Sequence, residues 1–590
     1  MYRTFNCGEL GVKNAGKKAV LAGWVDSRRD HGSLTFIELR DRYGTTQVVL
    51  NPEKNKVVHE TGKKLRREFV VQVEGAVRKR PKGTENRKLS TGEIEVEAEK
   101  LSVLSASEPL PIEISDLNQS SEEARLKHRY LDLRNPSMQA SIIARHKITK
   151  IVRDFYDENG FLDIETPILA KSTPEGARDY LVPSRVNPGK FFALPQSPQI
   201  FKQLLMLSGF DRYMQVARCF RDEDLRADRQ PEFTQIDVEM SFVDENDVME
   251  VHERLMQRVF KEFLGVKLKT PFPKLSYDEA IAKYGIDRPD TRFGLELADV
   301  TKILSETEFN AFKVVVAGGG IIKAINVPGK ADFSRKDLQD LEDFVKIYKA
   351  KGLAAFKVSG AGVEGAIVKF FSQKVLQEFV KAVGAKENDL VVVVAGAPKV
   401  VNDSLGFLRN HLAGKLGLIK KGEWNFIWVK DFPMFDWSEE EQKLNAMHHP
   451  FTSPKKEDLE LIEKEPLKVR SNAYDLVLNG VEIGGGSIRI HTPELQSRVF
   501  SALGIKEEAA KEKFGFMLEA FKYGAPPHGG IAFGLDRFVM LLVGAETIRE
   551  VIAFPKNKAA VSLMDGSPGN VDEKQLKELS IKLDLPEEGV

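Results

Sequence analysis

The sequence predicts an α+β protein built from several domains, and three observations lead to this class. The 590 residues exceed what one hydrophobic core organises, so between two and four domains are expected. Short strand-like runs fill the first hundred residues, whereas the rest of the chain combines amphipathic helices with separate strands. The hydrophobic content of 42% and charged content of 29% are those of an ordinary globular protein.

Residues 1–105 are predicted to form a small β-barrel. β-branched and aromatic residues gather in five runs, which are 19–25, 34–39, 46–50, 69–77 and 93–98. A helix-like stretch, 54–65, lies between the third and fourth runs. Five strands with a helix in this place are typical of an OB-fold barrel, which often binds single-stranded nucleic acid. A generic small barrel without a ligand is the alternative.

The pattern changes after this barrel. Residues 106–140 read as a hinge or linker, because Pro109-Leu110-Pro111 is followed by a polar stretch. Residues 141–287 begin the next domain with a long amphipathic helix from about Ser141, which ends near Asn159-Gly160. A strand at 161–164 follows and ends before Pro167.

An inserted α+β domain is predicted over residues 288–421. It holds apolar runs at 314–317 and 391–394 and no dense cluster of catalytic side-chain types. Residues 422–560 return to strand character at 425–429, 476–482 and 531–534, and are predicted to complete the domain that 141–287 begins. Residues 561–590 are assigned as a C-terminal extension.

Composition excludes several classes of protein. Cys7 and Cys219 provide neither a disulfide framework nor a CxxC metal site, and buried thiols in a reducing cytoplasm are expected. No apolar run approaches the roughly 20 residues of a membrane helix, so no membrane association is expected. The 87 basic and 87 acidic residues argue against a histone-like binder but allow a local basic face. No GxxxxGK[ST] or GxGxxG loop is present, so any ATP chemistry must use side chains.

Three segments offer such side chains. In 219–239 a strand, a charged loop and a second strand follow one another, and alternation puts Phe233, Gln235, Asp237 and Glu239 on one strand face. An ion-paired surface hairpin is the alternative. Residues 475–489 contain two carboxylates suited to Mg²⁺, Asp475 and Glu482, and three glycines that permit close approach of a substrate. A plain glycine-rich turn is the alternative. Residues 529–537 run from a strand into an apolar helix, with Arg537 at the junction or simply solvated.

Together these segments resemble the three signature motifs of class II aminoacyl-tRNA synthetases. The helix and strand ending at Pro167 resemble motif 1, the Arg221 segment motif 2, and Gly534-Leu535-Asp536-Arg537 motif 3. The blocks 173–184, 194–199 and 448–451 are similar to aspartyl enzymes, and residues 351–354 lie in a segment that looks like the insertion of the bacterial type. The resemblance implies a class II antiparallel-sheet catalytic domain, a homodimer built on motif 1, and a ligase for L-aspartate, ATP and tRNA-Asp.

The resemblance also implies individual roles. Lys202 and Arg489 would bind the β-carboxylate of aspartate, as two cations that select a carboxylate over an amide. Arg221 would hold the α-phosphate of ATP and stabilise its developing charge, and Arg537 would hold the γ-phosphate. The other aspartate contacts would be Glu175, Ser197, Gln199, Asp237 and His448, the other ATP contacts Asp222, Glu223, Gln230, Phe233, Glu482, Gly534, Leu535 and Asp536, and the Mg²⁺ ligands Asp475 and Glu482.

In this family the barrel reads the anticodon. Phe36 would stack on an anticodon base, with Arg29 and Gln47 beside it. His31 and Gly83 stand where relatives that also charge tRNA-Asn often have these residues, and a neutral imidazole has one donor and one acceptor, so it suits either C or U. The hypothesis is therefore charging of both tRNA-Asp and tRNA-Asn. The alternatives are an enzyme for tRNA-Asp alone, an asparaginyl or lysyl enzyme, and an inactive RNA-binding paralogue.

Overall fold

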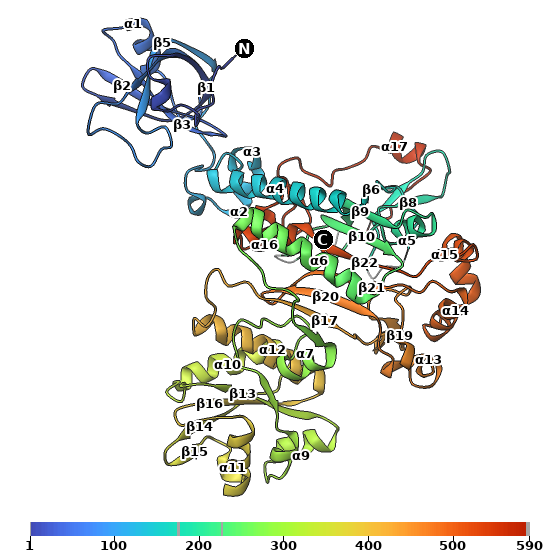
Figure 1. The fold of residues 1–590 in the computed structure, drawn as a ribbon. Helices are drawn as coiled ribbons and strands as arrows, with labels where there is room; N and C mark the ends of the chain where they lie inside the picture. The colour runs from blue at the N-terminus through green and yellow to red at the C-terminus, as the bar shows by residue number, and fades with distance from the viewer. Residues whose placement is uncertain (1, 174–176, 226–227, 586–590) are drawn as a thin grey trace. The chain divides into compact units, whose positions relative to one another are not determined.

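The computed structural model describes residues 2–173, 177–225 and 228–585 (Figure 1). Internal contacts divide the chain into two compact units. One unit runs to residue 140 and includes residues 562–565, and the other holds residues 141–561 and the chain from residue 566. None of the described helices is long and apolar enough to span a membrane.

The first unit contains a closed five-stranded barrel with the strand order β1-β2-β3-β5-β4. Alternate residues of the strands point inward, and Leu21, Ile37, Val48, Val73 and Val96 are fully buried there. The prediction of an OB-fold barrel is confirmed. Its elements are β1 (Lys18–His31), β2 (Leu34–Asp41), β3 (Gly44–Leu50), α1 (Lys56–Lys63), β4 (Val70–Lys79) and β5 (Ile94–Ser105).

The segment read from sequence as a hinge or linker is more ordered than that description. It carries α2 (Glu122–Lys127) and α3 (Arg129–Asp132), and Ile112, Ile114 and Leu131 form a small core. These apolar residues are too sparse to show a helical period, which is why the sequence reads as polar loop. The long helix α4 (Pro136–Glu158) begins five residues earlier than expected, because Asn135 caps it and Pro136 opens it.

An eight-stranded sheet forms the centre of the second unit, with the order β11-β17-β20-β21-β22-β10-β9-β6. Neighbouring strands are antiparallel, except for β6 beside β9 and β11 beside β17 at the two edges. The prediction of an antiparallel-sheet domain is confirmed. The strands are β6 (Leu162–Asp163), β9 (Arg212–Phe220), β10 (Glu232–Ser241), β11 (Lys274–Ser276), β17 (Phe426–Lys430), β20 (Ala473–Leu478), β21 (Val481–Ile488) and β22 (His528–Gly534).

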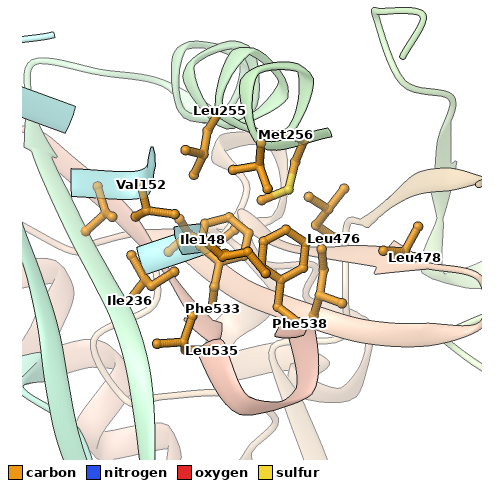
Figure 2. Packing of buried hydrophobic residues seen from close by; sticks show 14 of the residues in the cluster. Ile148, Val152, Ile236, Leu255, Met256, Leu476, Leu478, Phe533, Leu535 and Phe538 are labelled. Carbon is orange, nitrogen blue, oxygen red and sulfur yellow. The ribbon is translucent and has the colours of Figure 1, made fainter. Parts of the chain in front are cut away.

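One face of this sheet is apolar and carries the main core. Ile148 and Val152 of α4 and Leu255 and Met256 of α6 (Glu245–Val259) pack there against Phe533 of β22 (Figure 2). The remaining helices and strands of this part are α5 (Gln199–Leu207), α7 (Tyr277–Tyr284), α13 (Leu461–Lys464), α14 (Pro493–Ala502), α15 (Glu507–Phe521), α16 (Leu535–Val543), α17 (Glu573–Glu578), β7 (Leu181–Pro183), β8 (Phe191–Ala193), β18 (Phe435–Ser438) and β19 (Lys443–Ala446).

The prediction of a single strand at 476–482 is wrong. This stretch forms a hairpin in which Asn479 and Gly480, with φ of 53° and 80°, join β20 to β21. An Asn-Gly pair favours this left-handed turn because neither residue is strained there, and the sequence did carry that signal.

Between α7 and β17 the chain forms a second sheet with the order β12-β13-β16-β14-β15. Separate cores cover its two faces, one built with α10 and α12 and the other with α8, α9 and α11. The apolar run 314–317 lies in a helix and the run 391–394 in a strand. The bounds are β12 (Leu297–Asp299), α8 (Thr301–Ser305), α9 (Asn310–Ala317), β13 (Ile321–Val327), α10 (Arg335–Ile347), β14 (Ala354–Ser359), β15 (Gly362–Glu364), α11 (Gln373–Ala382), β16 (Leu390–Gly396) and α12 (Pro398–Lys415).

Candidate active site

The polar face of the large sheet is built by alternation along β10. Ile236 and Val238 point into the main core, so Asp237 and Glu239 point to the opposite face. Helix α5 packs on that face, and its Lys202 lies between the two carboxylates. Its Nζ is 3.1 Å from Oδ1 of Asp237 and 3.3 Å from Oε2 of Glu239. The shared strand face inferred from the sequence therefore exists, and it is buried.

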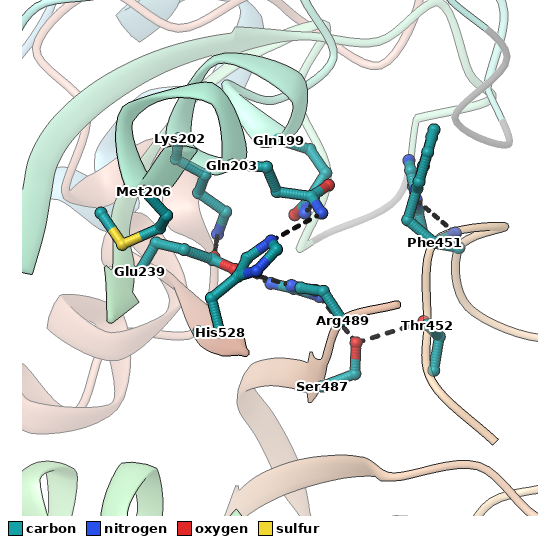
Figure 3. Close-up of polar contacts among 12 residues, drawn as sticks. Gln199, Lys202, Gln203, Met206, Glu239, Phe451, Thr452, Ser487, Arg489 and His528 are labelled. Carbon is teal, nitrogen blue, oxygen red and sulfur yellow. Dashed lines mark hydrogen bonds and ion pairs between the residues drawn. The ribbon is translucent and has the colours of Figure 1, made fainter. Parts of the chain in front are cut away.

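Arg489 brings a second cation to the same carboxylate. It lies just beyond β21 and donates to Glu239 from Nε at 2.8 Å and from Nη2 at 3.1 Å (Figure 3). A third hydrogen bond, from Nη1 to Oγ of Ser487 at 2.7 Å, fixes the plane of the guanidinium. The two residues predicted to grip a substrate carboxylate, Lys202 and Arg489, thus meet at Glu239. Glu239 is not among the site residues predicted from the sequence, although strand alternation places it on this face.

The electrostatics of this cluster differ between its two carboxylates. Burial alone would raise the pKa of Glu239, but Arg489 and Lys202 outweigh it and lower that pKa to about 2. Burial dominates at Asp237 and raises the pKa of its carboxyl, although Lys202 opposes the shift. Oδ2 of Asp237 is buried and accepts no hydrogen bond from any of the described residues. The cluster therefore presents an unused acceptor beside two cations.

A polar cavity of about 320 Å³ opens over the middle strands of the sheet. The guanidinium carbon of Arg221 lies 5.1 Å from the centre of the Phe233 ring, and its Nε is buried without a partner among the described residues. Arg537, from the first turn of α16, donates to the backbone oxygen of Glu482 at 2.7 Å and to Asp228 at 3.1 Å. These positions bring together the predicted phosphate-binding arginines, Arg221 and Arg537. Arg288 also lines the cavity, and no sequence motif had indicated it.

Other predicted ATP contacts are engaged within the fold. Gln230 lines the cavity, but its amide pairs in both directions with the backbone of Lys556, at 3.0 and 2.8 Å. Asp536 accepts from Arg145 and from the backbone N–H of Thr234, so it ties α4 and β10 to α16. The side chain of Leu535 is buried in the main core, so only its backbone is left to make the predicted contact with a nucleotide.

The charged loop before β10 holds the remaining predicted contacts. Glu223 accepts from Arg229 at 2.6 Å and lines the cavity. The backbone of Asp222 pairs with the backbone of Arg178. Nε of Arg178 also lies 3.6 Å from Oδ2 of Asp222. Gly534 lines the cavity at the end of β22.

Two predicted metal ligands face each other beside the cavity. A Cβ at Gly485 would lie 2.5 Å from Oδ1 of Asp475 and 3.7 Å from Oε1 of Glu482, so both carboxylates converge on this glycine. Burial, together with the charges of Glu482 and Asp287, raises the pKa of Asp475 well above its ordinary value. Two close carboxylates that resist ionising together fit a divalent cation, which would neutralise them with hard oxygen ligands.

Two glycines of the triplet 484–486 serve the packing of the protein itself. A Cβ at Gly484 would lie 2.4 Å from the Phe533 ring, and one at Gly486 would lie 2.0 Å from the backbone oxygen of Gly530. At Gly484 and Gly486 neighbouring strands therefore make the close approach inferred from sequence, whereas Gly485 faces the carboxylate of Asp475.

The other predicted aspartate contacts border the cluster. Gln199 opens α5 and its backbone N–H bonds to Oγ of Ser197 at 3.3 Å. His448 is exposed and packs edge-on against Phe432. Glu175 lies outside the described residues.

In the barrel, β1, β2 and β3 bring three of the predicted anticodon contacts together. Arg29 is paired with Phe36 across the strands, lies 5.9 Å from its ring centre and donates to Gln47 at 2.7 Å. Arg29 is exposed and Phe36 half-buried, so both are open to a ligand. His31 ends β1 and is exposed, while Gly83 follows β4 with φ of 89°.

Comparisons with known proteins agree with this architecture. Residues 121–558 match the family described as tRNA synthetases class II (D, K and N), and residues 19–104 match the OB-fold nucleic acid binding domain. The chain belongs to this family of class II tRNA synthetases. It is 57% identical over 583 residues to the Aspartate–tRNA(Asp/Asn) ligase of Caldanaerobacter subterraneus subsp. tengcongensis, which covers 99% of this chain and 98% of that protein. It is 54% identical over 580 residues to the protein of the same name in Geotalea uraniireducens, with 98% of both chains covered.

Solved structures share the fold at low sequence identity. An asparaginyl-tRNA synthetase from Pyrococcus horikoshii, complexed with asparaginyl-adenylate, matches with a TM-score of 0.60 at 19% identity and covers 94% of this chain and 98% of its own. An aspartyl tRNA synthetase from Entamoeba histolytica matches with a TM-score of 0.57 at 20% identity, covering 93% and 90%.

Proposed function

We propose that the chain is an aspartate–tRNA ligase, which activates L-aspartate with ATP and transfers it to tRNA-Asp and tRNA-Asn. The observation that carries the choice of amino acid is the meeting of Lys202 and Arg489 at Glu239. A substrate β-carboxylate gains attraction from both cations, whereas a neutral amide gains none of it. The names of the two relatives described above support the same substrate and the same two tRNAs.

The proposed reaction depends on positioning and on charge. The aspartate α-carboxylate attacks the α-phosphorus of ATP in line, an O–P bond forms, and the bond to pyrophosphate breaks. Arg221 would face the α-phosphate where negative charge builds up, and Arg537 the γ-phosphate. In the second step the terminal hydroxyl of tRNA attacks the adenylate carbonyl carbon, and AMP leaves.

The charging of two tRNAs is the direct test of this proposal. We expect labelled aspartate to be esterified to purified tRNA-Asp and tRNA-Asn in separate reactions, at comparable rates. The reason is that exposed His31 offers both a donor and an acceptor to the last anticodon base, which is C in one tRNA and U in the other. A tRNA with an unrelated anticodon serves as the control.

The outcomes separate the alternatives. Charging of tRNA-Asp alone would show a discriminating enzyme and refute the role of His31. ATP–pyrophosphate exchange driven by asparagine or lysine but not by aspartate would refute the choice of amino acid. Absence of any exchange would favour an inactive RNA-binding paralogue, against which the retained Arg221, Glu482 and Arg537 argue.

We also propose that Asp475 and Glu482 hold Mg²⁺, whose charge would neutralise the phosphates of ATP. Because burial raises the pKa of Asp475, Mg²⁺ binding displaces a proton from this carboxyl at any pH below that pKa. We expect the Mg²⁺ affinity, measured by titration calorimetry, to rise with pH by up to about tenfold per unit until Asp475 ionises. Asp475→Asn removes this titrating proton. The variant should therefore bind Mg²⁺ more weakly, with an affinity that does not depend on pH. An unchanged Mg²⁺ affinity in Asp475→Asn would contradict the assignment.

Further proposals concern the domains and the assembly. Residues 1–105 would read the anticodon, 141–287 and 422–560 would form the catalytic domain, and 288–421 would be an insertion. A homodimer is supported by apolar side chains left exposed around β6 and β8, which are Leu162, Ile168, Leu169, Phe191 and Phe192. Sedimentation of the purified chain as a monomer would contradict it. The buried thiols of Cys7 and Cys219, which form no disulfide within the described residues, are compatible with a protein of the reducing cytoplasm.

A further inference from the structure

A chain of hydrogen bonds runs behind the predicted aspartate site. Nδ1 of His528 lies 2.7 Å from the backbone oxygen of Pro526. Nε2 of the same ring lies 3.1 Å from the side-chain nitrogen of Gln203, and Oε1 of Gln203 lies 3.0 Å from Nε2 of Gln199 (Figure 3). His528 and Gln203 are fully buried and Gln199 is almost so. Water therefore offers these groups no alternative partner.

The direction of each hydrogen bond follows from the first. A carbonyl oxygen only accepts, so Nδ1 of His528 must carry the hydrogen and donate it to Pro526. Burial lowers the pKa of this imidazole, so the ring is neutral and its Nε2 is an acceptor. Gln203 must then turn its NH₂ group toward His528, and its oxygen toward Gln199. Gln199 in turn must donate to that oxygen through its own NH₂ group.

This series of hydrogen bonds ends at Gln199, whose side-chain oxygen is left as an acceptor. Oε1 of Gln199 accepts no hydrogen bond within the described part of the chain. Asp237, which contacts Lys202 of the same helix, likewise keeps a buried oxygen without a partner in the described residues. Two unused acceptors suit an ammonium group, which only donates. If Gln199 were turned over, its NH₂ group would face that ammonium and repel it.

We propose that His528 and Gln203 form a relay that orients the amide of Gln199, so that its Oε1 receives the α-ammonium of aspartate. This inference rests on the function proposed above. His528 and Gln203 are positioning residues, because they act on the substrate only through Gln199. The relay also links two distant segments of the chain, since Gln203 and His528 are separated by 325 residues.

The test compares two ligands that differ in the ammonium group. Gln203→Met keeps the length of the side chain but removes both relay contacts, so Gln199 can turn over. In ATP–pyrophosphate exchange we expect the KM for aspartate to rise by roughly tenfold, as for the loss of one hydrogen bond to a charged group, with kcat nearly unchanged. Succinate has both carboxylates but no ammonium, so its inhibition constant should not change. Met206→Leu, a buried change on the same helix, is the matched control.

A second pair of variants protects the test against a folding defect. His528→Leu removes the acceptor for Gln203, whereas His528→Gln can keep an oxygen near the position of Nε2. We expect His528→Leu to repeat the rise in KM and His528→Gln to restore part of the affinity. Equal weakening of aspartate and succinate, or an unchanged KM in Gln203→Met, would overturn the relay. Lack of exchange by the unaltered protein would instead refute the proposed function on which the relay rests.

Discussion

Replacing Arg489 with leucine is expected to lower kcat/KM for aspartate by about two to four powers of ten. The change removes one of the two cations proposed for the β-carboxylate, and it leaves Glu239 buried with Lys202 as its remaining ionic partner. Breaking a buried ion pair in this way costs about 3–5 kcal/mol. ATP–pyrophosphate exchange measures the catalytic loss, and thermal unfolding measures the accompanying loss of stability.

The pH dependence of this loss has a definite sign. In the unaltered protein the pKa of Glu239 is lowered to about 2, so its pairing stabilises the fold above the unfolded pKa of 4.5 and is lost as the pH falls toward 2. Arg489→Leu raises this pKa. The difference in melting temperature between the two proteins should therefore be largest above about pH 5 and narrow on acidification.

An exposed pair of the same chemistry provides the control. Arg498 donates to both carboxylate oxygens of Glu463, at 2.7 and 3.0 Å, in a solvent-exposed position on α14. Arg498→Leu should change stability by less than about 1 kcal/mol and leave the exchange rate unaltered. If Arg489→Leu behaved like Arg498→Leu, the proposed role of the buried cluster would be wrong.

The sequence predicted the parts of the fold that depend on local patterns. Alternation along β10 placed Asp237 and Glu239 on one polar face, because a strand has a strict period of two. The barrel was recognisable because its five strands are separated by turn residues. The Asn479-Gly480 hairpin was also readable from its turn signal, but the apolar run that crosses it was interpreted as one strand.

What the sequence could not predict depends on contacts between distant segments. Glu239 becomes a central residue only because Arg489 arrives 250 positions later and Lys202 approaches from α5. Gln203 and His528 belong to no charged motif, and their relay exists only where α5 meets β22. Leu535 is the opposite case, a motif residue whose side chain takes part in the core. The motif suggested a nucleotide contact, but its position on the helix turns the side chain inward.

Arg221→Leu is expected to lower kcat of ATP–pyrophosphate exchange by about 10²–10³-fold, with a smaller change in the KM for ATP. Its Nε is buried without a partner in the described part of the chain, beside the ring of Phe233, and this group would be used only when charge develops on the α-phosphate. Arg537 differs because it is already held by the backbone of Glu482 and by Asp228 at the rim of the cavity.

This contrast distinguishes two uses of a phosphate-binding arginine. Arg537→Leu should mainly raise the KM for ATP, since a contact to the γ-phosphate is made equally in the ground state and the transition state. Arg221→Lys should recover only part of the lost kcat, because an ammonium keeps the charge but not the planar fork. Arg212 is exposed and begins β9, the strand that ends directly before Arg221. Arg212→Leu should therefore alter neither constant. Similar effects on KM and kcat in the Arg221 and Arg537 variants would mean that both arginines bind ATP uniformly, and that stabilisation of the transition state lies with other groups in the cavity.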